Sequence, residues 1–424
     1  MFQLKVLLYR IIIASLRIAN SLLPIPKPLL LSGSDSSLQM VQLISGSNVR
    51  CIMLVTDKIL MELGVVSRLL NQFEELNVQV VLFDEILPDP TDAVIEKGIS
   101  LAKAHKCDAV VAVGGGSVID AAKLIAILAT KSRSLKSCRG LLKVWFRGLP
   151  LYAVPTTAGT GSEATMVAVM TLAEQHQKVP VIAPALVPKI AALDPALLVK
   201  LPPAITAATG MDALTHAIEA YTSVNASKAT DEFALNAIAL IFKHLPVCYR
   251  QGNDMAARQA MLFASTYAGF AFTKAGVGYV HAIAHQLGAK YRVPHGLANA
   301  IVLPKVMQFL LPSVEAKFGH MAQQVTGRPE RGDKFIEQVA ALRSELNIPN
   351  VVEPLRVEDH EDIAKAALNR VRAATAMDGI VQGTADKQVI TAVAVEDTAT
   401  AAKRDDLVIA RAAVQFKTNG LVHL

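Results

Sequence analysis

The sequence predicts two domains: an α/β domain with a parallel sheet, followed by an all-α domain. Up to about residue 155, short β-branched runs alternate with amphipathic segments, the pattern of a parallel sheet covered by helices on both faces. After about residue 201, Ala and Leu dominate long helical stretches and the β-branched runs thin out. A chain of 424 residues is also too long to fold around one common core.

Four short apolar runs are predicted to be strands, and two segments with helical periodicity separate the first three. The predicted strands are 51–57, 78–84, 108–113 and 151–155, and the predicted helices lie near 59–73 and 91–105. Each run is bounded by polar or turn residues, as short buried strands usually are. We expect the α/β domain to span residues 31–200 and the helical domain 201–424, with a boundary near Pro202 and Pro203.

Residues 1–30 are predicted to form an N-terminal extension. Its apolar segment from Leu4 to Pro24 is interrupted by Arg10 and Arg17, so it lacks the run of about 18 uncharged residues that a membrane-spanning helix needs. A signal peptide would need a longer apolar centre and a clear cleavage site. We therefore expect a basic amphipathic helix that packs against the protein or a partner, with weak contact to a membrane surface as the alternative.

Composition narrows the range of partners. The chain is 52% apolar and 18% charged, which is typical of a well-buried globular protein. The net charge is +6, but only 5% of residues are aromatic and we identify no run of Lys and Arg interleaved with aromatics, so we predict no nucleic-acid binding. The four cysteines lack zinc or disulfide spacing and are expected to be free thiols in a reducing, cytoplasmic compartment.

The sequence GGGSVIDAAK, residues 114–123, follows the third predicted strand. Glycines allow a sharp turn and close approach to a ligand, and the amide groups at the start of the following helix suit a phosphate. We expect Ser117 to cap this helix, with Asp120 three residues later in a variant of the capping box. A tight turn kept for packing alone is the alternative. The motif indicates phosphate rather than a particular nucleotide, because G-x-G-x-x-G and a Walker lysine are absent.

A second loop of small residues, PTTAGTGSE at 155–163, follows the fourth predicted strand. Its hydroxyls and glycine amides could bind pyrophosphate oxygens or an amide-bearing ring, although an ordinary polar loop has the same composition. Two such loops at the carboxyl ends of neighbouring parallel strands form a crevice in which ligands bind. The pair therefore predicts a dinucleotide-binding crevice.

Polar side chains interrupt two apolar helical segments of the second domain. Asp212 and His216 are four residues apart, on one helix face, and His281 and His285 repeat that spacing. His295 follows a short turn. A single buried histidine is usually a core residue, but five such groups in two compact clusters favour a divalent metal site. The spacing alone leaves open whether His281 or His285 is the ligand.

These four motifs, taken together, resemble those of the iron-containing (group III) alcohol dehydrogenases, and the resemblance runs from about residue 28 to about residue 368. It implies a dehydroquinate synthase-like fold and reversible hydride transfer between a primary alcohol and NAD. It also implies that Fe(II), or Zn, is bound by Asp212, His216, His281 and His295. His285 would then lie near the nicotinamide and relay a proton.

The resemblance also implies the contacts of the cofactor. The positions that match its two loops are Gly115, Gly116, Ser117, Asp120, Thr156, Thr157 and Thr160. Lys178 matches a lysine near the cofactor ribose, and Asp57 matches an acidic residue that accepts from the adenosine ribose hydroxyls. A 2'-phosphate would be repelled by Asp57, which favours NAD over NADP. Asp89 stands where some relatives have Asn.

Two other functions are compatible with these motifs: a hydroxyacid-oxoacid transhydrogenase or polyol dehydrogenase on the same scaffold, and an inactive metal and nucleotide binder at a membrane surface. The expected substrate is a small alcohol or aldehyde, and the expected assembly is a homo-oligomer. Two parts depart from the family pattern: the N-terminal extension, and the tail after about residue 373, which is rich in Ala, Thr and Val.

Overall fold

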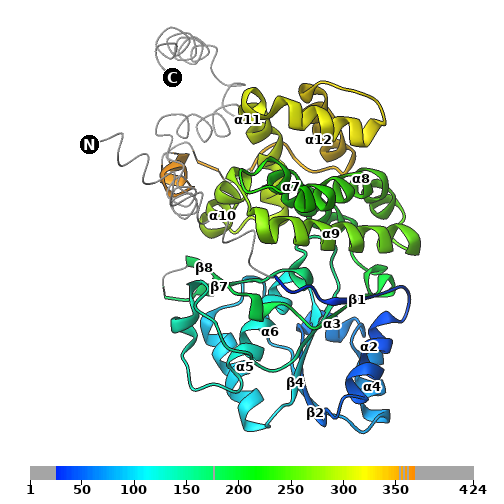
Figure 1. The fold of residues 1–424 in the computed structure, drawn as a ribbon, viewed down its shortest axis with the longest axis vertical. Helices are drawn as coiled ribbons and strands as arrows, with labels where there is room; N and C mark the ends of the chain where they lie inside the picture. Colours follow the sequence, from blue (N-terminus) through cyan, green and yellow to red (C-terminus); the bar gives the residue numbers. More distant parts are fainter. Residues whose placement is uncertain (1–24, 175–176, 353–354, 357–358, 361, 368–424) are drawn as a thin grey trace.

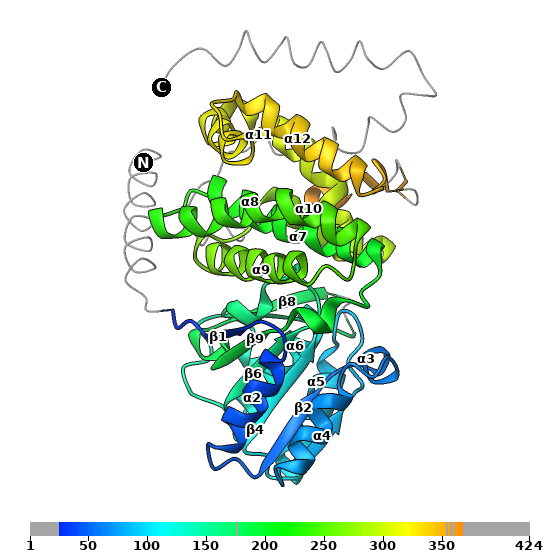
Figure 2. The same cartoon turned by 90° about the vertical axis from the view of Figure 1, so that its right-hand side faces the viewer.

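A computed structural model describes residues 25–367, apart from 175–176, 353–354, 357–358 and 361. An α/β domain and a helical domain lie one above the other (Figures 1 and 2). The helix predicted within residues 4–24 and the atypical tail after residue 373 lie outside the described residues. The fold class predicted from the sequence is confirmed.

The α/β domain is built on a six-stranded, all-parallel sheet with the order β1-β9-β6-β4-β2-β3. Its strands are β1 (Leu29–Ser32), β2 (Cys51–Val55), β3 (Gln79–Phe83), β4 (Ala109–Gly114), β6 (Leu151–Pro155) and β9 (Ile190–Leu193). The four predicted strands are β2, β3, β4 and β6. The sequence analysis missed β1 and β9, because a strand of four residues is too short to show a period. It placed the first residues of β1 in the N-terminal extension.

Helices cover both faces of this sheet (Figure 1). One face carries α2 (Ser36–Ser45) and α4 (Ser67–Glu75), and the other carries α5 (Asp92–Ala104) and α6 (Gly116–Leu128). Successive residues of a strand face opposite sides, so Ile52 packs with the first pair of helices and Met53 with the second. The helix predicted at 59–73 is interrupted at Gly64, whose φ is 69°, and forms α3 (Lys58–Glu62) and α4.

A smaller sheet is formed by one strand that precedes β6 in the chain and two that lie between β6 and β9. Its strand order is β5 (Gly140–Leu141), β8 (Gln177–Ile182) and β7 (Val167–Leu172), with β7 and β8 antiparallel. Short 3₁₀ helices connect these segments: η1 (Leu135–Cys138), η2 (Ser162–Ala164), η3 (Pro184–Leu186) and η4 (Pro195–Leu198). The sequence analysis did not predict this sheet, which extends the second small-residue loop toward the helical domain.

The helical domain packs largely through alanines, which let its helices approach closely. Its helices are α7 (Pro203–Thr222), α8 (Lys228–Arg250), α9 (Met255–Ala275), α10 (Tyr279–Tyr291), α11 (His295–Thr326) and α12 (Gly332–Glu345). By length and composition, α11 is the one helix of the described residues that could cross a membrane. Half of its apolar window is buried inside the protein, and it packs on α7, α10 and α12 as a core helix.

All four cysteines are free and buried, as the sequence analysis predicted for their thiols. The Sγ atoms of Cys51 and Cys107 lie 3.8 Å apart between β2 and β4. Burial, together with Cys51, raises the pKa of the Cys107 thiol to about 12. That thiol therefore stays protonated, and therefore weakly reactive, at neutral pH.

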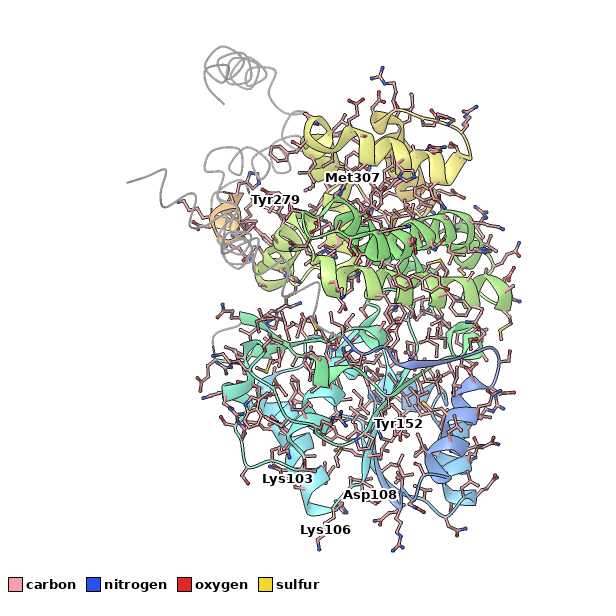
Figure 3. All side chains as sticks on the ribbon, viewed as in Figure 1. Lys103, Lys106, Asp108, Tyr152, Tyr279 and Met307 are labelled. Atoms are coloured by element: carbon pink, nitrogen blue, oxygen red, sulfur yellow. The ribbon has the colours of Figure 1, made fainter. Side chains whose placement is uncertain are left out.

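The carboxyl ends of the parallel strands face the helical domain. Asp108, at the start of β4, lies at the far end of the α/β domain in Figure 3, so the glycines that end this strand point toward α7 and α9. The two domains meet at Gly161, whose φ is 60°. A Cβ there would lie 2.6 Å from the carbonyl oxygen of Ser265, and one on Gly269 would lie 2.7 Å from the carbonyl oxygen of Gly161. Only glycine fits either position.

Candidate metal centre and cofactor loops

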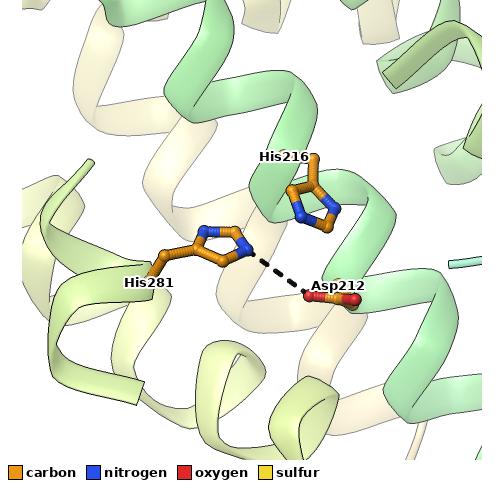
Figure 4. Close-up of side chains that lie close together, drawn as sticks. All are labelled: Asp212, His216 and His281. Atoms are coloured by element: carbon orange, nitrogen blue, oxygen red, sulfur yellow. Dashed lines mark ion pairs between the residues drawn. The ribbon is translucent and has the colours of Figure 1, made fainter. Parts of the chain in front are cut away.

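Three buried side chains from two helices converge in the helical domain (Figure 4). Asp212 and His216 lie on α7 and His281 lies on α10, and one ligand-type atom from each lies within 4.8 Å of the other two. All three residues are buried. The four-residue spacing on α7 does place Asp212 and His216 on one face, as expected. The structure also distinguishes between the two histidines of α10, because His281 and not His285 joins this cluster.

His295, the first residue of α11, approaches the same carboxylate. Its Nε2 and the Nε2 of His281 each lie 3.7 Å from Asp212 Oδ1. The side-chain nitrogen of Asn299 donates to Asp212 Oδ1 at 2.6 Å and lies 3.3 Å from His281 Nε2 and 3.2 Å from His295 Nε2. One carboxylate oxygen and two imidazole nitrogens thus lie around one amide group. One carboxylate and three imidazoles are ligands that Fe(II) and Zn accept, so these residues fit a divalent cation.

A second carboxylate orients His281. Glu219 Oε2 lies 2.6 Å from His281 Nδ1, and the same carboxylate accepts from the backbone N–H groups of Gly278 at 2.8 Å and Val280 at 2.6 Å. When Nδ1–H donates to Glu219, the lone pair of Nε2 is directed toward Asp212. Glu219 therefore fixes the ring of His281 and also binds amide groups at the start of α10.

The sequence analysis missed Glu219 and Asn299. The signal that could have identified them is the same helical spacing that identified the histidines. Glu219 lies three residues after His216 on α7, and Asn299 lies four residues after His295 on α11. Each therefore shares a helix face with a predicted ligand.

Burial keeps two of the imidazoles neutral. It lowers the pKa of His216 to about 3 and that of His295 to about 4, although Asp212 opposes both shifts. Nδ1 of His216 is buried without a hydrogen-bond partner. A neutral ring offers a lone pair to a metal ion, so this electrostatic setting favours ligation.

For Asp212 and His281, neighbouring groups outweigh burial and favour the charged form of the side chain. Burial favours the neutral form of Asp212, but His216, His295, His281 and the Asn299 amide together outweigh it and lower the pKa of this carboxyl group. Burial also opposes the charged form of His281, yet the Glu219 carboxylate and Asp212 raise its pKa. The site therefore contains ionised Asp212 close to a histidine that Glu219 stabilises.

His285 lies beside this cluster on its more accessible side. It is half-buried, one turn after His281 on α10. Its ring stacks on that of His295, with ring centroids 5.1 Å apart, and meets the ring of His281 edge-on at 6.1 Å. This position connects the buried cluster to the surface.

The two small-residue loops lie against each other at the carboxyl ends of β4 and β6. Thr156 donates its backbone N–H to the carbonyl oxygen of Gly114 at 3.1 Å. A Cβ on Gly115 would lie 3.3 Å from Thr157 Oγ1, and one on Gly116 would lie 2.6 Å from Thr160 Cγ2. Gly115 is the N-cap of α6 and offers no side chain to it, so the first amide groups of the helix can bind an anion.

The predicted capping box at this helix is wrong. Ser117 lies inside α6 rather than at its N-cap, and its hydroxyl accepts from the backbone N–H of Asp89 at 3.3 Å. Asp120 instead fastens the second loop to α6, accepting from the Ser162 hydroxyl at 2.5 Å and from the backbone N–H of Val169 at 2.8 Å. Three consecutive glycines permit an uncapped start, which is why the capping residue is dispensable here.

Asp120 shares its surroundings with a buried lysine. The ammonium group of Lys123 donates to Ser162 Oγ at 3.0 Å, to Thr165 Oγ1 at 2.9 Å and to the carbonyl oxygen of Val167 at 2.6 Å. Burial lowers the pKa of Lys123 to about 8, against the pull of Asp120 and Glu163. This cluster holds α6, the second loop and β7 together.

The remaining predicted cofactor residues lie on the rim of the α/β domain. Asp57 follows β2 and caps α3, with Oδ1 accepting from the backbone N–H of Leu60 at 2.9 Å. Lys178 on β8 pairs with Asp89, with its Nζ 2.6 Å from Oδ1. Asp89 has a φ of 58°, a conformation that Asp and Asn tolerate. The charge of Lys178 contributes, after burial, to the lowered pKa of His295, so this lysine lies near that member of the cluster.

Uncapped helix amides on a parallel sheet, facing a buried carboxylate and imidazole cluster in a helical domain, define a metal-dependent enzyme that uses a nucleotide. Residues 28–195 match the family model described as "Iron-containing alcohol dehydrogenase". Residues 206–393 match that of the "Fe-containing alcohol dehydrogenase family, C-terminal". The chain belongs to the iron-containing alcohol dehydrogenase family, and the C-terminal match continues into the tail that we had set apart.

Individual relatives agree with this assignment. The chain is 36% identical over 346 residues to alcohol dehydrogenase 4 of Saccharomyces cerevisiae, which covers 81% of this chain and 91% of that protein. It is 37% identical over 327 residues to the NAD-dependent methanol dehydrogenase of Bacillus methanolicus, which covers 75% and 86%. The crystal structure of a 1,3-propanediol oxidoreductase matches with a TM-score of 0.82 and 34% identity, covering 88% and 99%. The protein is thus a metal-dependent, NAD-linked alcohol dehydrogenase of the iron-containing type.

Proposed function

We propose that the protein transfers hydride reversibly between a small primary alcohol and NAD, with the metal ion bound by Asp212, His216, His281 and His295. The observation that carries this assignment is the convergence of the Asp212 carboxylate and the His281 and His295 imidazoles around the Asn299 amide in a buried site. Methanol and 1,3-propanediol appear in the names of two relatives, which supports a short substrate with a terminal hydroxyl group.

A bound divalent ion supplies Lewis-acid polarisation of the alcohol oxygen, and NAD accepts the hydride. The residues of this chain prepare the site for that reaction. Asp212 provides one negative charge, which lowers the cost of placing a doubly charged ion in a buried site but leaves a net positive charge there. That charge favours the deprotonated form of the alcohol. Glu219 holds His281 in the orientation that ligation needs.

We assign proton transfer to His285. Its half-buried ring is stacked on His295 and can exchange protons with solvent on its accessible side. Alcohol oxidation releases a proton that must leave a buried site, and an imidazole within reach of water is suited to that task. In the reverse direction the same ring returns a proton to the reduced product.

We assign the pyrophosphate of NAD to the uncapped amide groups of α6. The residues that support this are Gly115, Gly116 and Ser117 from the first loop and Thr156, Thr157 and Thr160 from the second. Asp120 acts by positioning the second loop. Asp57, at the end of β2, is assigned to the adenosine ribose, and Lys178, which lies near His295, to the nicotinamide ribose side.

The direct test is metal analysis of anaerobically purified protein alongside an NAD-linked screen with butanol, glycerol and 4-hydroxybutyrate. We expect about one iron per chain and the fastest NADH formation with butanol. If the protein contains zinc rather than iron, the identity of the proposed metal changes but the proposed mechanism stays the same. Preference for glycerol would indicate a polyol dehydrogenase. Oxidation of 4-hydroxybutyrate with an oxoacid as acceptor, without NAD, would indicate a transhydrogenase.

Replacement of His281 by Ala separates an enzyme from an inactive binder. A dehydrogenase loses metal and turnover together, whereas an inactive metal and nucleotide binder gives no NADH signal before or after the change. His105→Ala, at an exposed position in the α/β domain, is the matched control and should alter neither metal content nor turnover.

A cytoplasmic location and a homo-oligomeric assembly remain proposals. The free, buried cysteines support a reducing compartment. Cell fractionation tests the location, and light scattering during size-exclusion chromatography tests the assembly. Membrane contact through residues 4–24 is the alternative location, and deletion of those residues should then release the protein from a membrane fraction.

A further inference from the structure

The net charge of the protein originates in one surface segment. Residues 131–147, between α6 and β6, contain no acidic residue and six basic ones: Lys131, Arg133, Lys136, Arg139, Lys143 and Arg147. Without these six, 36 of the 42 Lys and Arg remain, which equals the 36 Asp and Glu. The rest of the chain is therefore electrically balanced. Our sequence analysis overlooked this run because its only aromatic residues are Trp145 and Phe146.

The same segment exposes large apolar side chains. Trp145, the single tryptophan of the chain, is 82% exposed, and Leu141 and Leu142 are 42% and 47% exposed. Leu142 adopts a positive φ of 52°, a conformation that is unfavourable for a bulky residue. The fold thus holds apolar groups in water beside a concentrated positive charge.

The segment is fixed to the domain rather than loosely attached. Leu135, Cys138 and Val144 are buried in the core, and Leu142 donates its backbone N–H to the carbonyl oxygen of Ile182 at 2.8 Å. These anchors leave the intervening side chains on the outside. The exposed surface is therefore a constant feature of the α/β domain.

Two of the basic side chains lie over the ring of Phe146. The Lys131 ammonium lies 5.6 Å and the Arg133 guanidinium 5.4 Å from the centre of its half-buried ring, and the Trp145 ring meets it edge-on at 6.2 Å. Such contacts keep basic groups next to the exposed indole. Arg139 differs, because it pairs with Asp92 of α5 at 3.8 Å.

The combination of charge and apolar side chains identifies the partner. Lys and Arg attract anionic headgroups, Trp prefers the interface between headgroups and acyl chains, and exposed leucines gain free energy by leaving water there. A nucleic acid would use the cations and the indole, but it offers no apolar medium for Leu141 and Leu142. We propose that residues 131–147 dock the protein on the surface of an anionic phospholipid bilayer, with Trp145, Leu141 and Leu142 entering the headgroup region.

Trp145 provides a direct test in the unmodified full-length protein, since all tryptophan fluorescence comes from it. We expect a blue shift with vesicles of phosphatidylcholine and phosphatidylserine, and none with phosphatidylcholine alone. Added salt should reverse the shift, because the attraction is largely electrostatic. Vesicle sedimentation gives the bound fraction independently.

Paired variants separate this segment from the rest of the chain. Arg133→Gln/Lys143→Gln should lower the partition coefficient on anionic vesicles by about 25-fold, at about fivefold for each lost cation. Arg328→Gln/Arg331→Gln removes the same charge from exposed arginines of the helical domain and should leave binding unchanged. Trp145→Ala should weaken sedimentation with vesicles. All of these variants should keep the NAD-linked activity measured without lipid, which confirms their fold.

Three results would overturn the proposal. The first is vesicle binding without a Trp145 shift, or with equal losses in both double variants, which would assign the contact to another part of the chain such as residues 4–24. The second is a shift with a single-stranded oligonucleotide and none with vesicles, which would make the segment a nucleic-acid surface. The third is no binding to either. None of these results depends on the proposed alcohol substrate.

Discussion

Each domain buries a polar cluster at the junction between the two domains, and the clusters differ in where their positive charge comes from. In the helical domain, Asp212 and His281 face the neutral Asn299 amide. In the α/β domain, Asp120 lies beside the ammonium group of Lys123. The cluster of the α/β domain contains a cationic side chain, Lys123. The cluster of the helical domain has instead the dipole of the Asn299 amide and His281, which Glu219 orients.

This difference distinguishes a cluster that stabilises the fold from a cluster that binds a ligand. A buried carboxylate is costly unless a cation or several hydrogen bonds stabilise it. Lys123 is a cationic side chain within the cluster of Asp120 and Glu163, so this cluster serves to hold the fold together. The cluster around Asp212 instead has the side chains that a divalent cation accepts as ligands. Four changes test this contrast, taken from the largest expected effect to the smallest.

Asp212→Ala should abolish the metal centre. It removes the only carboxylate of the proposed ligand set, so we expect metal content close to zero and turnover lowered by more than about 10³-fold. Metal analysis and steady-state NADH formation measure the two losses. Asp35→Ala, at an exposed carboxylate paired with Arg68, is the control. A full metal complement in Asp212→Ala would exclude this residue from the site.

Lys123→Met should destabilise the α/β domain. The change leaves Asp120 and Glu163 buried without a cation, which typically costs about 3–5 kcal/mol of unfolding free energy. Urea denaturation measures this loss. Lys97→Met breaks an exposed pair with Glu85 and should cost less than about 1 kcal/mol. Equal losses in the two variants would mean that Lys123 does not stabilise the buried carboxylates.

Glu219→Gln should weaken metal binding without removing a ligand. Gln keeps one acceptor for the amide groups of α10 but loses the charge that orients His281, so we expect affinity to fall about 10–100-fold. Competition with a chelator measures it. Glu232→Gln on the exposed side of α8 is the control. Lower stability with unchanged affinity would show that Glu219 only caps α10.

Acid should destabilise the metal-free protein through His216. Its pKa is about 3 in the folded state and about 6.5 when unfolded, so between these values the unfolded state binds a proton that the folded state does not. The His216 contribution to stability is therefore lost as pH falls below about 6.5, by about 1 kcal/mol between pH 6.5 and 5.5. His295, whose pKa is about 4, adds a loss of the same sign. Chemical denaturation of the metal-free protein at both pH values tests this. If His216→Gln shows the same dependence as the unchanged protein, His216 is not its source.

The parts of the site that lie on a single helix or at the end of a single strand could be predicted from the sequence. Asp212 and His216 share a face because they are four residues apart, and the glycine loop was identifiable because three consecutive glycines have few other uses. Spacing did not distinguish His281 from His285, and the family resemblance made that choice; the structure brings His281 into the cluster, because its ring is the one that meets α7. Local spacing cannot say how two helices pack.

Other features depend on distant parts of the chain and were missed for that reason. Asp120 connects the second loop to α6 by accepting hydrogen bonds from Ser162 and Val169, which are more than 40 residues away in the sequence. The sequence analysis considered only a local role for Asp120, in a capping box. Strands β1 and β9 pair with each other across the whole α/β domain and have no periodicity of their own. The basic segment 131–147 was overlooked because only basic runs interleaved with aromatics were considered, and its two aromatic residues lie side by side near its end.

The contact of Gly161 with Gly269 limits how the two domains can move. Backbone lies directly on backbone there, and Ser265 Oγ also accepts from the N–H of Gly161 at 3.1 Å. The two domains therefore cannot slide past each other at this point without breaking the contact, and a side chain added to either glycine would push them apart.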